Sequence, residues 1–302
     1  MKYSTKNIIL SLLLLLFSAP IIAQTDLIFS QHGMNQKLFN PAAINDNGML
    51  NLDLMARQQW VGFPDAPTVQ FVGAELFMED QPMGLKFGFI NQTAGKEITR
   101  QMALSYAYQV RLSQDLFAQF GLSAGFYQRK ILFSELTFEQ GNEPFIKPDE
   151  SALKPDFSFG FEVFWNRFTL GMAANHLTTP NRKATVFKIP LHNHFYLTYR
   201  HQLDQDISLV SGVFWHQQGS LNRLQLDSQF DFGSWEAGLA YRYQDAIIFK
   251  AGINLSEYIR LSYAYDLGIS KIANYNSGTH EISLQFGIPR KGGAFLSPRF
   301  LD

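Results

Sequence analysis

Runs of alternating apolar and polar residues, each about ten residues long, follow one another along most of this chain, as transmembrane β-strands require. In the clearest run, the apolar residues Leu50, Leu52, Leu54 and Ala56 alternate with Asn51, Asp53, Met55 and Arg57. Successive side chains of a strand point to opposite faces, so each run has one apolar and one polar face. The pattern recurs at 116–126, where the polar face is small, and at 223–231. It predicts an all-β fold, either an antiparallel transmembrane β-barrel or a soluble β-sandwich.

The connections between the runs favour the barrel. About fourteen strands are expected, at 49–59, 68–78, 83–91, 99–110, 115–128, 156–165, 168–176, 193–202, 206–216, 221–231, 234–243, 246–254, 258–266 and 279–288. The longest connections, 129–155, 177–192 and 267–278, all follow odd-numbered strands. Bacterial barrels have short periplasmic turns and longer extracellular loops, so the odd-numbered connections should lie outside the cell. A sandwich gives no reason for this asymmetry.

Composition also favours a surface that faces lipid. Charged residues make up 17% of the chain and aromatic residues 15%, whereas soluble domains average roughly 25% charged residues. Four tryptophans lie near expected strand ends, which is typical of aromatic girdles, although ordinary core tryptophans are the alternative. They are Trp60, Trp165, Trp215 and Trp235.

The first residues have the pattern of a secretory signal. Lys2 and Lys6 precede an apolar stretch at 8–17, and small residues before Gln24 suit a signal peptidase. The apolar stretch is short for a spanning helix. We therefore expect an outer-membrane protein with four parts. These are a signal peptide at 1–23, a periplasmic or plug segment at 24–48, the barrel at 49–288 and a C-terminal tail at 289–302.

Charged residues on the polar faces of the expected strands fit a polar barrel interior. They are Lys86, Glu162, Arg200, Arg223, Asp227, Arg242, Lys250 and Arg260. These residues either line a conduit or neutralise one another across a filled lumen. Their mixed signs argue against a strongly ion-selective pore.

The sequence offers no evident catalytic or metal-binding motif. It contains no cysteine, which excludes disulfides and thiol catalysis. HExxH, GxSxG and phosphate-binding glycine loops are also absent. His192 and His194 should share one face of a strand, but their segment supplies no third ligand. We expect no enzymatic activity, no cofactor and, at a net charge of -1, no nucleic-acid partner.

An ordered set of sequence blocks resembles the PorP/SprF family, outer-membrane proteins of the type IX secretion system. The blocks lie at 26–32, 38–43, 57–60, 66–68, 154–160, 175–180 and 277–282. They span nearly the whole mature chain. The candidate family-motif positions are Asn40, Pro41, Ala42, Arg57, Gln59, Trp60, Gly278, Thr279, His280 and Glu281.

This resemblance implies a barrel that works with the secretion or gliding machinery. The implied partners are outer-membrane lipid, the C-terminal sorting domain of a large secreted adhesin, and ring-forming lipoproteins on the periplasmic side. The function expected from it is non-enzymatic assistance in exporting and anchoring the adhesin. An outer-membrane channel for hydrophobic or small-molecule uptake and an outer-membrane hydrolase are the alternatives.

Two of the blocks also make a structural prediction. Asn40, Pro41 and Ala42 favour a chain reversal with few side-chain contacts, suited to holding a segment at the barrel mouth. Arg57 stands near the end of the first expected strand and Glu281 near the start of the last. Barrel closure pairs these two strands, so we expect the two blocks to be neighbours. They form either a closure seam alone or a partner-binding surface.

Overall fold

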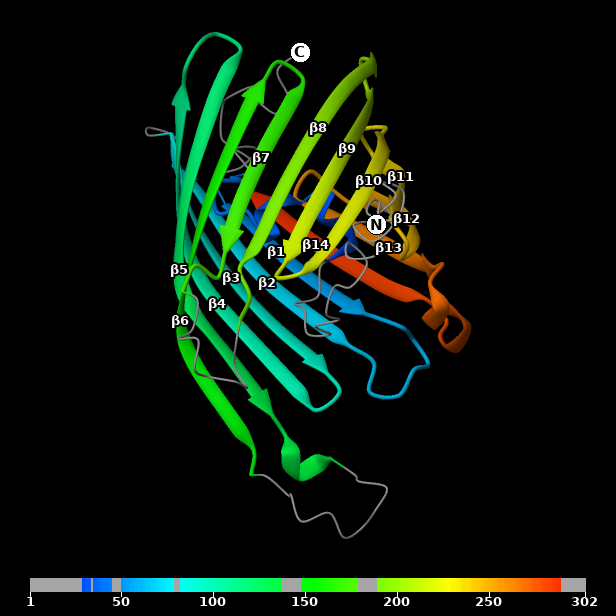
Figure 1. The fold of residues 1–302 in the computed structure, drawn as a ribbon. Helices are drawn as coiled ribbons and strands as arrows, with labels where there is room; N and C mark the ends of the chain where they lie inside the picture. Colours follow the sequence, from blue (N-terminus) through cyan, green and yellow to red (C-terminus); the bar gives the residue numbers. More distant parts are fainter. Residues whose placement is uncertain are drawn as a thin grey trace, which may run out of the picture.

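A computed structural model shows a closed antiparallel barrel of fourteen strands in which neighbours in sequence are neighbours in the sheet (Figure 1). The structure describes residues 29–33, 35–44, 50–78, 82–136, 148–178 and 189–288. The expected signal peptide and C-terminal tail lie outside these residues. β1 pairs with β14 and closes the ring. The predicted all-β barrel is therefore confirmed.

All fourteen expected strands are present. They are β1 (Leu50–Gln58), β2 (Thr68–Met78), β3 (Met83–Ala94), β4 (Glu97–Arg111), β5 (Leu116–Ile131), β6 (Glu150–Trp165), β7 (Phe168–Asn175), β8 (His192–Asp204), β9 (Ile207–Gln218), β10 (Leu221–Asp231), β11 (Trp235–Arg242), β12 (Ala246–Asn254), β13 (Ile259–Gly268) and β14 (Thr279–Ile288). The short 3-10 helices are η1 (Ser30–Gly33), η2 (Gln36–Leu38), η3 (Phe133–Glu135) and η4 (Lys271–Tyr275). No helix in the described part of the chain is long and apolar enough to cross a membrane.

The expected bounds of the loop at 129–155 are wrong at both ends. β5 continues to Ile131 and β6 begins at Glu150, so these ends are strand. Pro155 lies within β6, in register with Phe126 of β5. The carbonyl of Pro155 faces away from β5 and accepts a hydrogen bond from Thr178 Oγ1 (2.7 Å). β7 pairs with β6 only up to Phe159, so the missing N–H of this proline costs no ladder hydrogen bond.

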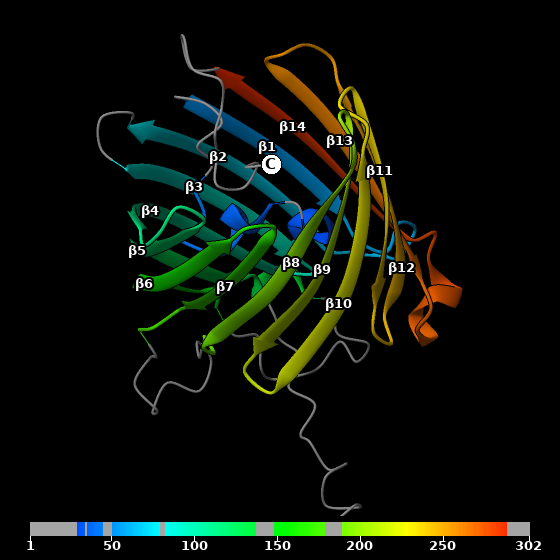
Figure 2. The same cartoon turned by 90° about the horizontal axis from the view of Figure 1, so that it is seen from above.

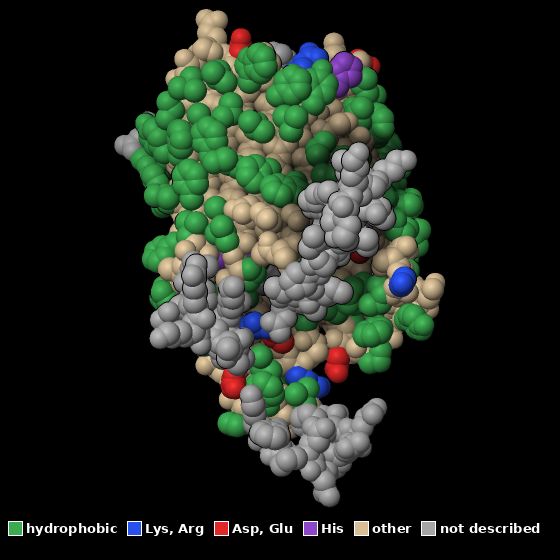
Figure 3. All heavy atoms as spheres, viewed as in Figure 1, with side chains coloured by type: hydrophobic (Ala, Val, Ile, Leu, Met, Phe, Trp, Pro, Cys, Tyr) green, Lys and Arg blue, Asp and Glu red, His purple; other side chains and the backbone are tan. Residues whose placement is uncertain are grey.

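Side-chain burial is the reverse of that in a soluble protein. Apolar side chains cover the outer wall, and most charged groups in view lie near the two ends (Figure 3). Leu104 and Leu122 are 66% and 63% exposed, whereas Glu162 and Glu281 are fully buried. The eight charged residues expected in the lumen all alternate with outward-facing residues and lie on the inner face. A polar interior inside an apolar wall excludes the sandwich.

The tryptophans partly follow the expected pattern. Trp165 is the last residue of β6 and Trp235 the first of β11. Both are about half exposed, which excludes the core alternative for them. They stack on Phe168 and Phe232. Trp215 lies three residues before the end of β9 and stacks on Phe195, so it belongs to the wall and not to a strand end.

The described part of the N-terminal segment lies inside the barrel (Figure 2). We call residues 29–33 and 35–44 the plug. It begins beside Glu281, at the end of the barrel that carries the odd-numbered connections. It ends with Ile44, which packs with Phe77 and Ala107 near the opposite end. The plug therefore crosses the lumen from one end towards the other.

Candidate functional site

The first anchor of the plug is a buried charge network at the seam between β1 and β14. Arg57 and Glu281 are register partners. Arg57 Nη1 donates to Glu281 Oε2 (3.1 Å), and Arg57 Nη2 donates to Asp266 Oδ2 (3.0 Å). The Glu281 carboxylate also accepts the backbone N–H groups of Ser30 (2.7 Å) and Gln31 (3.0 Å). The seam thus holds the main chain of η1.

The Ser30 side chain completes this network. Its Oγ accepts hydrogen bonds from Arg57 Nη1 (2.5 Å) and Arg242 Nη2 (3.0 Å) and donates one to Asp266 Oδ2 (2.6 Å). These three bonds use the full capacity of a hydroxyl. Two guanidinium groups and two carboxylates balance each other in charge, which a buried cluster requires.

The middle of the plug has apolar and ionic contacts. Phe29 forms a buried cluster with Met55, Val69 and Phe71 of β1 and β2. Lys37 Nζ lies 2.6 Å from Asp53 Oδ2 and makes a longer contact with the Glu75 carboxylate. Inward-facing residues of the first two strands therefore hold η1 and η2 in place.

The second anchor is the Asn40-Pro41-Ala42 turn. Asn40 Oδ1 accepts the N–H of Ala42 (2.9 Å), and Asn40 O accepts the N–H of Ala43 (3.1 Å). These bonds form the predicted chain reversal. Lys86 Nζ donates to Asn40 O (2.7 Å) and Ala43 O (2.8 Å). Lys86 thereby ties the turn to the barrel wall.

The expectation of few side-chain contacts at this turn is wrong. Asn40 Nδ2 donates to Tyr196 Oη (2.7 Å), which in turn donates to Glu162 Oε1 (2.7 Å). A buried amide must satisfy both of its ends, and Asn40 does so by joining the plug to β6 and β8. The turn therefore lies against the inner wall and is fixed there by its side chain.

Two glycines make room for this turn. A Cβ on Gly121 would lie 2.2 Å from Ala42 N, and one on Gly160 would lie 2.0 Å from Asn40 Oδ1. No side chain fits at such distances, and in the first case the obstacle is main chain. Gly121 and Gly160 are register partners in β5 and β6. They form a flat seat for the turn.

Phe39 packs against aromatic rings of β8 and β9. It stacks on His194 at 4.7 Å between ring centroids and meets His216 edge-on at 5.2 Å. Its carbonyl accepts a hydrogen bond from Asn175 Nδ2 (3.0 Å). His192 and His194 share the inner face of β8, as predicted. Within the described residues, no group of three His, Asp or Glu side chains is placed to hold a metal ion.

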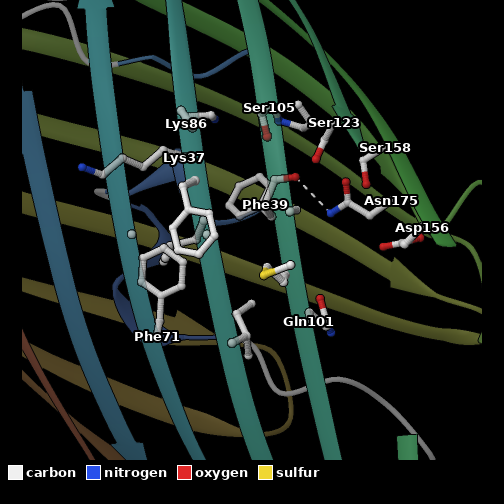
Figure 4. Close-up of a pocket in the computed structure, with 18 of the residues that line it drawn as sticks. Lys37, Phe39, Phe71, Lys86, Gln101, Ser105, Ser123, Asp156, Ser158 and Asn175 are labelled. Carbon is white, nitrogen blue, oxygen red and sulfur yellow. Dashed lines mark hydrogen bonds between the residues drawn. The ribbon is translucent and has the colours of Figure 1, made fainter. Parts of the chain in front are cut away.

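A small cavity of about 120 Å³ remains between the plug and β2–β7 (Figure 4). Ser105, Ser123 and Ser158 form a row on its wall because they are register partners on β4, β5 and β6. Phe39 and Phe71 also line it. A cavity of this volume holds a few water molecules.

The structure places nine of the ten candidate positions at the two anchors or at the seam end, and the tenth, His280, on the outer wall. Asn40, Pro41, Ala42, Arg57 and Glu281 belong to the two anchors. Gln59, Trp60, Gly278 and Thr279 lie at the seam end: Trp60 N donates to Thr279 Oγ1 (3.2 Å), and Gln59 N donates to the Pro67 carbonyl (2.9 Å). His280 faces outward and pairs with Tyr263 Oη (2.6 Å). The expected proximity of the two blocks is thus observed.

Sequence reasoning missed several residues of the anchors. Asp266, Ser30, Tyr196 and the two glycines were not singled out, and Lys86 and Arg242 were seen only as lumen charges. The sequence does carry one signal that another segment lies against this strand, namely the small side chains on the polar face at 116–126. A strand whose inner face is Gly, Ser and Gly leaves space that another segment must fill.

Comparison with known proteins places this plugged barrel in a family. The family described as "Type IX secretion system membrane protein PorP/SprF" matches residues 21–286. The chain belongs to the PorP/SprF family. The match covers the plug and the strands up to β14, so both anchors lie within the part of the chain that defines this PorP/SprF protein. No curated protein is significantly similar to it.

The chain is also similar to solved structures, at low sequence identity. The toluene transporter TbuX of Ralstonia pickettii is 9% identical, with 86% of this chain and 94% of that chain covered and a TM-score of 0.51. Omp33 of Acinetobacter baumannii is 5% identical, with 80% and 98% covered and a TM-score of 0.49. A FadL homologue of Pseudomonas aeruginosa is 12% identical, with 85% and 93% covered and a TM-score of 0.46. The fold that this PorP/SprF chain shares with TbuX is the barrel described above, and the family makes the chain a membrane protein of the type IX secretion system.

Proposed function

We propose that this barrel is a non-enzymatic component of the type IX secretion and gliding machinery that assists export and surface anchoring of a large secreted adhesin. The observation that carries the proposal, beside the family, is the plug. Arg57 and Glu281 hold it at one end, and Lys86 and Tyr196 hold it near the other. A lumen filled in this way suits a scaffold that binds partners at its two rims.

The rim with the odd-numbered connections is the proposed surface for the sorting domain of the adhesin. Between β13 and β14, η4 projects from the rim, and Tyr275 is 74% exposed. Val61 N donates to the Gly278 carbonyl and Ser277 N to the Val61 carbonyl, both at 2.8 Å. This pairing fixes one end of the projection to the connection between β1 and β2. Exposed loops on a rigid scaffold commonly carry recognition.

The opposite rim is the proposed surface for the ring-forming lipoproteins. A polar hollow opens there, lined by residues of β1, β14 and the connection between β12 and β13. Asn51, Asp53, Asn254 and Gln285 are among its lining residues. Asn254 and Glu257 of its lining are exposed, so a large partner can reach them past the short turns at this end.

Deletion and loop replacement test the proposal in cells. Deleting the barrel should leave the adhesin synthesised but not displayed, with growth on small nutrients and membrane permeability near normal. Because β13 extends to Gly268, the segment to replace is 269–276. It is exchanged for a Gly/Ser segment of the same length. Adhesin retention should fall while the barrel stays heat-modifiable.

A replacement at 112–114, in the connection between β4 and β5 on the opposite rim and outside the polar hollow, serves as the control and should leave adhesin display unchanged. Normal display after deletion of the whole barrel, with loss of uptake of one hydrophobic nutrient, would contradict the proposal and favour the uptake channel.

A further inference from the structure

We propose that the outer wall over β2–β6 binds a phosphorylated glycolipid of the lipid A class, with an acyl chain in an apolar groove and a phosphate on Arg100. This inference is independent of the adhesin proposal, because it concerns the lipid-facing wall and not the rims or the lumen.

The groove is a hollow of about 700 Å³ in the lipid-facing wall. Its floor includes the small residues Ala74 and Ala124, which leave the strand backbone uncovered. Larger side chains stand around the floor, namely Leu76, Leu85, Leu104, Tyr106, Leu122 and Phe157. Leu76, Leu85, Tyr106 and Leu122 form one continuous row, because they are register partners across β2 to β5. An acyl chain can fill a hollow of this shape and polarity.

A polar row crosses the same wall nearer the odd-numbered connections. Asn91 Nδ2 donates to Gln70 Oε1 (3.1 Å), and Arg100 Nε donates to Asn91 Oδ1 (3.2 Å). Gln128 is the register partner of Arg100 on β5. All four side chains project outward, on the face that carries Met102 and Leu104. Over β2–β5 we take this row as the level at which lipid headgroups begin.

Arg100 has the properties of an anion ligand at that level. It is exposed, and no carboxylate in the described part of the chain lies within ion-pair distance of it. Its bond to Asn91 uses Nε and orients the guanidinium, which leaves both Nη groups for another acceptor. Arginine binds phosphate in a bidentate manner through such a fork. An unpaired cation at headgroup level is best satisfied by a lipid phosphate.

The spacing of the two features fits one lipid. Arg100 lies four residues before Leu104 on β4, about 13 Å along the strand. Strands in such barrels tilt by roughly 35–45°, so the cation stands about 10 Å above the groove along the membrane normal. A lipid with its phosphate at Arg100 places its chain in the groove. The loop lengths put this end outside the cell, where lipid A forms the outer leaflet.

Native mass spectrometry of the full chain, extracted in mild detergent, tests the site. The wild-type barrel should retain lipid A, and Arg100→Gln and Ala124→Phe should each lower retention about tenfold, as expected for loss of charge-assisted hydrogen bonds or of the groove. Arg167→Gln, in the opposite turn, and Ala251→Phe, on the outer face of β12, are the matched controls and should retain lipid A fully. Heat-modifiable migration verifies folding of every variant.

The proposal requires both losses. Unchanged retention in either Arg100→Gln or Ala124→Phe, when that variant is folded, overturns it. Equal binding of dephosphorylated lipid A removes the role of the phosphate and also overturns it. Displacement by phosphatidylglycerol at equal concentration would show a general phospholipid contact in place of a site for the outer-leaflet glycolipid.

Discussion

Arg57 and Glu281 face each other across the seam that closes the barrel, with Arg57 Nη1 and Glu281 Oε2 3.1 Å apart, and both residues also bind Ser30 of the plug. Closure of the ring and docking of the plug therefore use the same two side chains. A change that disturbs the seam must also disturb the plug. Closure of the ring brings the two blocks together, and Ser30 of the plug docks where they meet.

The first prediction concerns charge balance at this seam. Arg57→Met leaves Asp266 and Glu281 with Arg242 as the single remaining cation of the network, and it should cost about 3–5 kcal/mol, the usual effect of breaking a buried ion pair. Arg57→Met combined with Glu281→Gln restores the balance and should cost less than the single change. Urea unfolding of the barrel in detergent measures both. Equal losses in the two variants would show that charge pairing does not govern this site.

The second prediction concerns the glycine seat. Gly121→Ala places a methyl group against the main chain of Ala42, so the turn must leave the wall and the lumen should open. We expect conductance in planar bilayers to rise clearly above that of the wild type. Gly88→Ala is the control, because its Cβ would meet only Phe71 at an ordinary 3.4 Å. Wild-type conductance in a folded Gly121→Ala barrel would contradict the role of the seat.

Much of this architecture could be predicted from sequence because the membrane enforces it. A spanning strand must alternate, and every backbone polar group must pair within a closed ring. The alternation therefore assigns Leu122 to the outer face and Ser123 to the inner face, and the number of alternating runs gives the number of strands. Barrel closure then makes Arg57 and Glu281 neighbours without any knowledge of the lumen. These inferences rest on period and on ring topology alone.

The path of the plug through the lumen could not be predicted in this way. Its backbone is irregular, so no period marks it, and its contacts join residues far apart in sequence. From the sequence, Lys86 cannot be distinguished from the other charged residues of the lumen. Only the structure shows its hydrogen bonds to the carbonyls of Asn40 and Ala43. The end of β5 and the start of β6 were also predicted wrongly. The parts of a strand that extend beyond the lipid do not need apolar outward-facing side chains, so the alternating pattern does not mark them. Pro155, at the end of the expected 129–155 connection, is tolerated within β6 because its nitrogen lies on the side of the strand that forms no ladder with β7 at this point.

The third prediction concerns pH at the start of β6. The backbone N–H and then the hydroxyl of Ser134 donate to Asp149 Oδ1 (3.1 and 2.8 Å) and hold the pKa of this exposed carboxyl below its usual value. The contact is therefore intact above the ordinary carboxyl pKa and is lost as the pH falls through the lowered one. Ser134→Ala should move the pKa upward but not fully, since the backbone donor remains. Carboxyl carbon NMR of the folded barrel measures this shift, and an unchanged pKa in Ser134→Ala would exclude the hydroxyl as a cause.

The last prediction tests the two faces of one strand. Leu122 is 63% exposed on the outer wall, so Leu122→Arg should cost on the order of 2–4 kcal/mol if it lies near the bilayer midplane. Ser123 faces the cavity that Asp156 also lines, so the guanidinium of Ser123→Arg meets water and a carboxylate instead of lipid. Its loss should be clearly smaller and should come from crowding against the plug. Unfolding in urea compares them, with heat-modifiable migration as the check on folding, and equal losses would contradict the assigned faces.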